Sequence, residues 1–211
     1  MAEHGLAALS VEEFLRRLAS GDPTPGGGAA SALGGALGAA LVSMVCNLTV
    51  GRERYAATEA EARAILDESE AVRDRLRRGI DEDAEAYGQV MRAYRLPRAS
   101  DDEKAARTAA IQEATYQAAL APLALAEAAV RVIELAERAL GKTNPNAVSD
   151  LAVAALLGVA ALDGAAANVE INLATLKDEE RRIELAERLA RARAGRREQA
   201  ERVVERAASG G

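Results

Sequence analysis

The sequence predicts an all-α protein, a single-domain bundle of long antiparallel helices that spans residues 1–211, with flexible tails at 1–9 and 207–211. Aromatic residues make up only 2% of the chain and hydrophobic residues 49%. A core built from Ala, Leu, Val and Ile suits close-packed helices better than β-sheets. Two long stretches are rich in Ala and Gly and nearly free of charge. Elsewhere apolar residues recur at three- and four-residue steps, and no segment alternates as a strand does.

Composition and charge narrow the functional classes. The formal net charge is −6, which argues against nucleic acid as a partner. His4 is the single histidine, which excludes histidine metal sites, Ser-His-Asp triads and Glu-x-x-His di-iron centres. Cys46 is the single cysteine, so we expect no disulfide and a cytoplasmic location. We expect its thiol to be a buried core group and not a nucleophile. No basic segment precedes an apolar one at the N-terminus, and no signal peptide is expected.

The first two predicted helices are joined by a Pro/Gly loop. Ser10 and Glu13 form a capping box that starts a short helix, which ends by Gly21. Residues 23–28 lead directly into an uncharged Ala/Gly-rich helix over residues 29–50. The unpaired N–H groups and the positive end of the dipole at such a helix start can hold an anion. The uncharged run is long enough to span a membrane, but large apolar residues are sparse, so we expect a buried bundle helix and no membrane contact.

A long helix is predicted over residues 52–96, with an apolar stripe that includes Leu76 and Tyr87. Asp83 falls on this stripe, where the period calls for an apolar residue. A carboxylate turned into a helical seam is costly unless it is paired or used, and desolvation raises its pKa. Asp83 is therefore either a structural carboxylate, which caps a neighbouring helix or pairs with an arginine, or an acid–base group.

The next helix begins at Ser100, is kinked or restarted at Pro122, and ends before Gly141. Residues 178–206 are dense in Arg and Glu and predict one solvated amphipathic helix.

Between these segments, the helix over residues 149–176 is again rich in Ala and low in charge. Asp150, Asn168 and Asn172 fall close to one of its faces, among small apolar residues. These polar groups either line a ligand site or make hydrogen bonds between helices.

Taken together, these segments resemble the cyclodeaminase/cyclohydrolase family, and the resemblance covers nearly the whole chain in order. The family comprises the C-terminal domain of formiminotransferase-cyclodeaminase and stand-alone bacterial formimidoyltetrahydrofolate cyclodeaminases and methenyltetrahydrofolate cyclohydrolases. The matching segments are Pro25-Gly-Gly-Gly28, Met44-Val-Cys-Asn-Leu-Thr-Val-Gly-Arg52, Asp83-Ala-Glu-Ala-Tyr87, Tyr94-Arg-Leu-Pro97, Asn146-Ala-Val-Ser-Asp150, Gly164-Ala-Ala-Ala-Asn168 and Ile171-Asn172.

The resemblance implies a one-carbon folate enzyme, in the first place formimidoyltetrahydrofolate cyclodeaminase. This activity converts 5-formimino-tetrahydrofolate to the 5,10-methenyl form and ammonia, and a separate formiminotransferase would supply its substrate. The alternative is methenyltetrahydrofolate cyclohydrolase, which opens the methenyl form to 10-formyl-tetrahydrofolate. A third hypothesis, of another class, is a non-catalytic helical oligomer that binds folate or another anion, or scaffolds partners.

The resemblance also implies a homodimer or higher homo-oligomer, which packs through the Ala/Gly-rich helices and has the folate site near the subunit contact. Neither folate reaction needs a metal or a redox cofactor, so no cofactor is expected beyond the tetrahydrofolate substrate itself.

For such a site, Asp83 is the candidate catalytic carboxylate, as an acid–base group or as a stabiliser of cationic character at the reacting carbon. Asp150, Asn168 and Asn172 suit the pterin edge. That edge offers hydrogen-bond donors to a carboxylate, and both donors and acceptors to an amide.

The glutamate tail of folate needs partners for its carboxylates. The backbone amides of Gly26, Gly27 and Gly28 are the candidates for this role, with Arg52 or Lys142 nearby.

Overall fold

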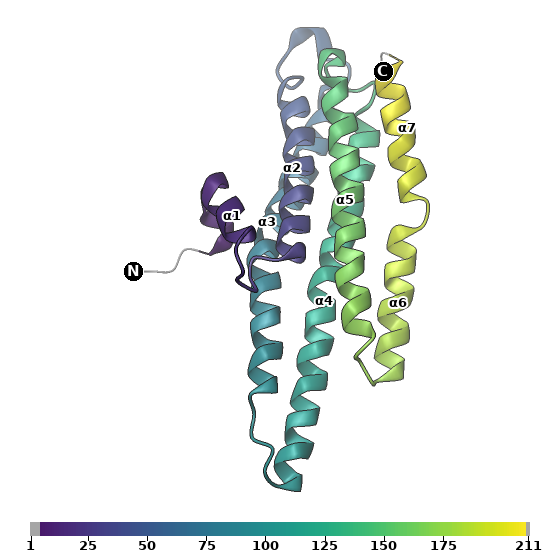
Figure 1. Ribbon diagram of the computed structural model, residues 1–211. Coiled ribbons are helices and arrows are strands. Elements are labelled where there is room, and N and C mark those ends of the chain that lie inside the picture. The colour runs from purple at the N-terminus through teal and green to yellow at the C-terminus, as the bar shows by residue number, and fades with distance from the viewer. Residues whose placement is uncertain (1–4, 210–211) are drawn as a thin grey trace.

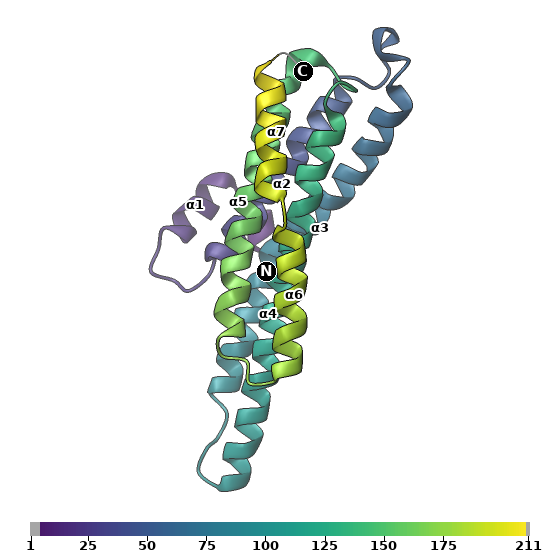
Figure 2. The same ribbon diagram turned by 90° about the vertical axis from the view of Figure 1, so that its right-hand side faces the viewer.

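The computed structural model describes residues 5–209, and this part of the chain forms helices and no strand, which confirms the all-α class. The bundle consists of α2 (Gly27–Asn47), α3 (Glu59–Tyr94), α4 (Asp101–Ala139) and α5 (Val148–Leu173). Each of these helices runs antiparallel to the one before it, and they surround a common core (Figure 1). Two further helices, α6 (Glu179–Arg193) and α7 (Arg196–Ala208), cover α4 and α5 from outside (Figure 2).

The N-terminal segment lies beside the bundle (Figure 1). A 3-10 turn at Leu6–Ala8 contacts α3, where the Ala7 N–H donates to the Asp81 carboxylate at 3.4 Å. The sequence pattern places this turn in a tail, and the contact with α3 orders it instead. The next helix, α1 (Val11–Leu18), begins at Ser10 as predicted, with the Ser10 hydroxyl accepting from the Glu13 N–H. His4 lies outside the described residues.

Small residues let the helices of the bundle approach closely. A Cβ added at Gly38 of α2 would lie 2.9 Å from the Val132 side chain and 3.0 Å from the Ala154 carbonyl oxygen. Both α2 and the segment Pro145–Leu173 are long and apolar enough to cross a membrane, and 50% and 44% of their most apolar windows are buried inside the chain. The two helices pack against each other along the bundle.

Several helix ends differ from the predicted bounds. Residues 52–58 are not part of α3: Gly51 turns the chain with φ +73°, and Glu53–Tyr55 forms a 3-10 turn. The segment predicted as one helix over residues 178–206 is divided into α6 and α7 at Gly195, whose φ of +70° interrupts the helix. At the C-terminal end α7 continues to Ala208, two residues into the predicted tail.

α4 continues through Pro122 without a restart. Proline has no N–H, so the carbonyl of Ala118 loses its normal helical donor. Asn172 of α5 replaces that donor, because its side-chain N–H₂ group donates to the Ala118 carbonyl oxygen at 2.9 Å and to the Asn168 carbonyl oxygen at 2.9 Å. The amide of Asn172 therefore makes one of the interhelical hydrogen bonds that the sequence pattern allows.

This arrangement predicts that the roles of Asn172 and Pro122 are coupled. Asn172→Ala should lower the free energy of unfolding by about 1–3 kcal/mol, because it leaves a buried carbonyl without a donor. In a Pro122→Ala background the new backbone N–H can serve that carbonyl, and the same substitution should cost about 1 kcal/mol less. Urea unfolding of the single and double variants measures the coupling, and equal costs in both backgrounds would contradict it.

Candidate functional site

A pocket of about 390 Å³ lies where α2 begins. α2 has 21 residues, against 36 in α3, 39 in α4 and 26 in α5. These three helices extend past the N-terminus of α2 (Figure 1), and the pocket lies below it. Its volume falls within the range of small-molecule sites. The walls include the loop 23–28, Asp83 and Tyr87 of α3, Pro122 of α4, and Asn168 and Asn172 of α5.

Asp83 joins the wall of this pocket to the first turn of α2. The N-cap residue, Gly26, has no side chain to cap the helix. Instead the Asp83 carboxylate accepts from the Ala29 N–H at 3.1 Å, so it takes the place of a capping side chain. Burial raises the pKa of Asp83 above its ordinary value, and the hydrogen bond from Ala29 opposes part of that rise. Asp83 therefore caps α2, and it also has the burial and the raised pKa that are typical of an acid–base group.

Gly28 is required by the closeness of Asp83. A Cβ at this position would lie 2.0 Å from a carboxylate oxygen of Asp83, so no other residue fits without displacing the carboxylate. The N–H groups of Gly27 and Gly28 belong to the first turn, which has no intrahelical acceptors for them. Two backbone donors and the positive end of the helix dipole thus lie next to the carboxylate.

Two asparagines of α5, Asn168 and Asn172, line the pocket. The amide nitrogen of Asn168 donates to the Gly164 carbonyl oxygen at 2.9 Å, and that of Asn172 donates to the carbonyl oxygens already described. Both N–H groups of Asn172 are used in this way, which leaves its side-chain oxygen as the group available to a ligand, whereas Asn168 keeps one N–H and its side-chain oxygen. The site therefore offers amide acceptors on the α5 wall and backbone donors at the start of α2.

Tyr87 lies at the mouth of the pocket with 42% of its surface exposed. The sequence pattern assigns it to the apolar stripe of α3 and gives it no place in the site. Its spacing of four residues after Asp83 is the signal that could have found it, since residues four apart share a helix face. An exposed aromatic ring at a pocket mouth can stack on a planar ligand.

The structure brings Asp83, Gly26–Gly28, Asn168 and Asn172 to one pocket, but not Asp150, Arg52 or Lys142. Asp150 lies in the first turn of α5, about 27 Å along the helix from Asn168. Its place on the same helix face does not bring the two side chains together, because the face runs the length of the bundle.

Arg52 and Lys142 are also at that far end of the bundle. Lys142 forms an ion pair with Glu61 at 3.1 Å. Arg52 lines a separate hollow of about 520 Å³, together with Arg54 and Asn144. In a single chain these cations cannot reach the pocket below α2.

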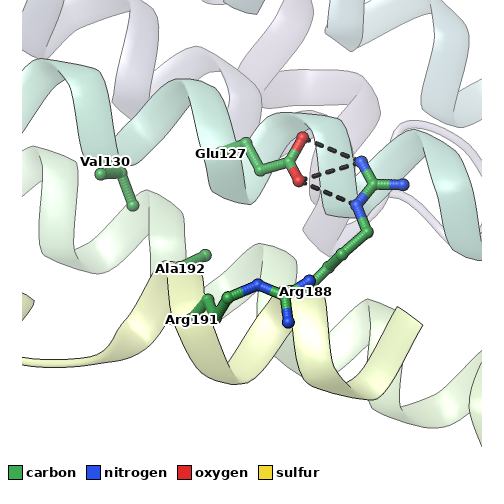
Figure 3. A pocket seen from close by; sticks show the side chains of 5 residues that line it. All are labelled: Glu127, Val130, Arg188, Arg191 and Ala192. Carbon is green, nitrogen blue, oxygen red and sulfur yellow. Dashed lines mark hydrogen bonds and ion pairs between the residues drawn. The ribbon is translucent and has the colours of Figure 1, made fainter. Parts of the chain in front are cut away.

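Two other features of the described chain are less suited to catalysis. Figure 3 shows a hollow between α4 and α6, where the Glu127 carboxylate is already engaged by the Arg188 guanidinium at 2.9–3.1 Å. Cys46 is fully buried in the core, and burial raises the pKa of its thiol to about 11. A thiol with that pKa is a poor nucleophile.

Residues 10–191 match the family model described as formiminotransferase-cyclodeaminase. The chain is 49% identical over 187 residues to methenyltetrahydrofolate cyclohydrolase from Methylorubrum extorquens, which covers 87% of this chain and 90% of that protein.

The chain is also similar to proteins named as cyclodeaminases. The chain is 34% identical over 177 residues to formimidoyltransferase-cyclodeaminase from Rattus norvegicus, covering 84% of this chain and only 33% of that longer protein. The crystal structure of formiminotetrahydrofolate cyclodeaminase from Thermotoga maritima superimposes with a TM-score of 0.85 at 31% identity, covering 96% of this chain and 97% of that one.

The raised pKa of Asp83 predicts a specific pH dependence of stability. The pKa of Asp83 is about 3.9 in the unfolded chain and higher in the folded chain. Between these two pH values the folded chain binds the Asp83 proton more tightly than the unfolded chain does. The stabilisation from this group is therefore complete below pH 3.9 and is lost as pH rises through the folded pKa. Urea unfolding across pH should show wild type losing stability relative to Asp83→Asn over this window. A constant difference, or one that moves the other way, would contradict the assignment.

Proposed function

Because the chain belongs to the formiminotransferase-cyclodeaminase family, we propose that it is a folate enzyme that acts on the one-carbon unit between N5 and N10 of tetrahydrofolate, as a methenyltetrahydrofolate cyclohydrolase. The observation that carries this proposal is the partly desolvated Asp83 carboxylate in the wall of the pocket, next to free backbone donors. The identity to the Methylorubrum cyclohydrolase, over nearly the full length of both chains, favours hydrolysis.

The chemistry follows from these groups. The Asp83 carboxylate accepts a proton from water as the water oxygen bonds to the methenyl carbon, which neutralises the cationic substrate. The carbon–N5 bond then breaks: Asp83 gives its proton to N5 and takes the hydroxyl proton as the formyl C=O forms on N10. Release of that proton to solvent restores the carboxylate, so one water is consumed and one proton is released.

The amides of Gly27 and Gly28 suit this reaction better than they suit the glutamate tail. They lie beside Asp83, and therefore beside the reacting carbon, whereas the aminobenzoyl group of folate holds the tail carboxylates away from it. Two backbone donors at a helix start can stabilise the negative charge that develops on the added oxygen. The side-chain oxygens of Asn168 and Asn172 would then accept from the donor groups of the pterin.

The second candidate is the cyclodeaminase reaction, which the similarity to the Thermotoga enzyme supports. In that reaction N10 attacks the formimino carbon on N5, and its proton passes through Asp83 to the departing nitrogen, which leaves as ammonia. A separate formiminotransferase would supply the substrate. The same carboxylate serves both reactions, and neither calls for a metal or a redox cofactor.

We further propose that the chain pairs with a second copy through the outer face of α2 and α5. α2 carries no charged residue, and the face exposes Leu37, Val153 and Leu156 at 51%, 47% and 53%. A patch of this kind marks an interaction site more often than a free surface.

The function is tested by the near-ultraviolet absorbance of methenyl-tetrahydrofolate. Added to the purified protein, this substrate should lose its absorbance, and Asp83→Asn should lower kcat about a hundredfold or more, because the proton acceptor is gone. If absorbance instead appears from 5-formimino-tetrahydrofolate, the protein is a cyclodeaminase. No change with either substrate would contradict both activities and favour the non-catalytic binding or scaffold hypothesis.

The dimer is tested by Leu37→Arg, which places a charge in the middle of the apolar face. The variant should elute as a monomer in size-exclusion chromatography with light scattering, whereas wild type elutes as a dimer. Ile183→Arg is the matched control, since Ile183 is similarly exposed, at 47%, but lies on α6. A monomeric wild type, or a Leu37→Arg variant that remains a dimer, would contradict the interface.

A further inference from the structure

A line of side chains leads away from the pocket toward the turn between α3 and α4. Residues eleven apart on a helix are three turns apart and differ by only about 20° in direction. Tyr94 comes eleven residues after Asp83 on α3, and Arg107 comes eleven residues before Ala118, which lines the pocket from α4. Because α3 and α4 are antiparallel neighbours (Figure 1), both lines run from the pocket to the same end of the bundle.

The two lines meet at Tyr94 and Arg107. The Nε–H and Nη2–H groups of Arg107 donate to the Tyr94 carbonyl oxygen at 3.2 and 2.9 Å, and the guanidinium lies over the Tyr94 ring, 5.6 Å from its centre. Tyr87 and Val90, which line the pocket, lie on α3 between Asp83 and this contact. We call Tyr87, Val90, Tyr94 and Arg107 the α3–α4 strip.

The charge of Arg107 has no carboxylate partner in the described part of the chain. Glu103, four residues earlier on α4, is the usual partner by helical spacing. Its carboxylate instead accepts from the N–H groups of Ala99 and Ser100 at 2.6 and 3.1 Å. The two bonds to Tyr94 hold the guanidinium in place and leave three of its five N–H donors unused. Arg107 is therefore a fixed, half-buried cation with free donors.

A folate in the pocket needs a cation that the pocket does not supply. None of the described lining residues is a lysine or an arginine, whereas the glutamate tail carries two carboxylates that are ionised at neutral pH. Asp83 and Tyr94 are separated by about 16 Å along α3. An extended aminobenzoyl-glutamate group is of comparable length, so a substrate with its one-carbon unit at Asp83 can place a tail carboxylate at Arg107.

The order of groups in the substrate matches the order of side chains along the α3–α4 strip. The aminobenzoyl ring is bonded directly to N10, so it is the first group beyond the one-carbon unit. Tyr87 is one turn, about 5–6 Å, beyond Asp83 on the same face of α3, and 42% of its surface is exposed. An exposed tyrosine ring at this distance can stack on the aminobenzoyl ring. Tyr94, 48% exposed, lies two turns farther along.

We propose that the aminobenzoyl-glutamate part of the substrate lies along the α3–α4 strip of the same chain, with its ring on Tyr87 and a tail carboxylate on Arg107. This inference rests on the proposed function, because it names residues that bind the rest of the same substrate. Arg107 is close to the end of the bundle (Figure 1), so further glutamates on a longer tail would continue past it into solvent.

A substrate without glutamate tests the role of Arg107. Methenyl-tetrahydropteroate ends at the benzoate carboxylate, one glutamate short of Arg107. Arg107→Ala should raise KM for methenyl-tetrahydrofolate about tenfold, because a charge-assisted hydrogen bond is lost. It should leave KM for methenyl-tetrahydropteroate, and kcat for both substrates, unchanged. Arg95→Ala is the matched control: it removes an exposed arginine beside Tyr94, but one that points about 100° away around the helix, so neither KM should change.

The role of Tyr87 is tested with the same two substrates. Tyr87→Ala should raise both KM values several-fold, since both substrates contain the ring, and Tyr87→Phe should keep the wild-type values. Three results would overturn the inference: an Arg107→Ala variant that changes neither KM, one that raises both equally, or a Tyr87→Phe variant as impaired as Tyr87→Ala. Turnover by wild type in the same assay separates these outcomes from failure of the proposed function. If wild type acts on 5-formimino-tetrahydrofolate instead, the formimino forms of the two compounds give the same comparison.

Discussion

The contact between the Asp83 carboxylate and the first turn of α2 holds the site together. Gly26 cannot cap the helix, so a carboxylate from α3 does so through the Ala29 N–H. The contact requires a glycine at position 28. Burial at this place raises the pKa of Asp83, and the hydrogen bond from Ala29 opposes part of that rise. The buried Asp83 carboxylate thus fixes where α2 begins against α3, and it is the group that the proposed reaction uses for proton transfer.

The pocket exists because the helices of the bundle differ in length. α2 is the shortest of the core helices, and its start leaves α3, α4 and α5 facing an open volume. Pro122 removes a helical hydrogen bond at this level, and Asn172 restores it from α5. Asn172 therefore supports the wall at the level where α2 is missing, and its side-chain oxygen is left to accept a hydrogen bond because both of its N–H groups are used.

The Ala- and Gly-rich composition of α2 and α5 has two consequences. Toward the core it lets backbones approach, as at Gly38, where a Cβ would meet Val132 and Ala154. Toward the outside it leaves α2 without a charged side chain and with Leu37 exposed. The same small residues thus serve close packing inside the bundle and, in the proposed dimer, the contact between two copies.

The sequence by itself determined the helical class, the capping at Ser10 and Ser100, and the position of Asp83 on the buried stripe. These features depend on residues close together in the chain, because capping hydrogen bonds are local and the 3.6-residue period can be seen within one helix. Tertiary structure decided which polar residues meet. Asp150 and Asn168 share a helix face, yet a face extends over the whole bundle, and only the start of α2 selects the end that forms a pocket. The role of Asn172 likewise depended on a carbonyl freed in another helix. Such pairings depend on which helices are neighbours and at what level, and helical periodicity carries no information about either.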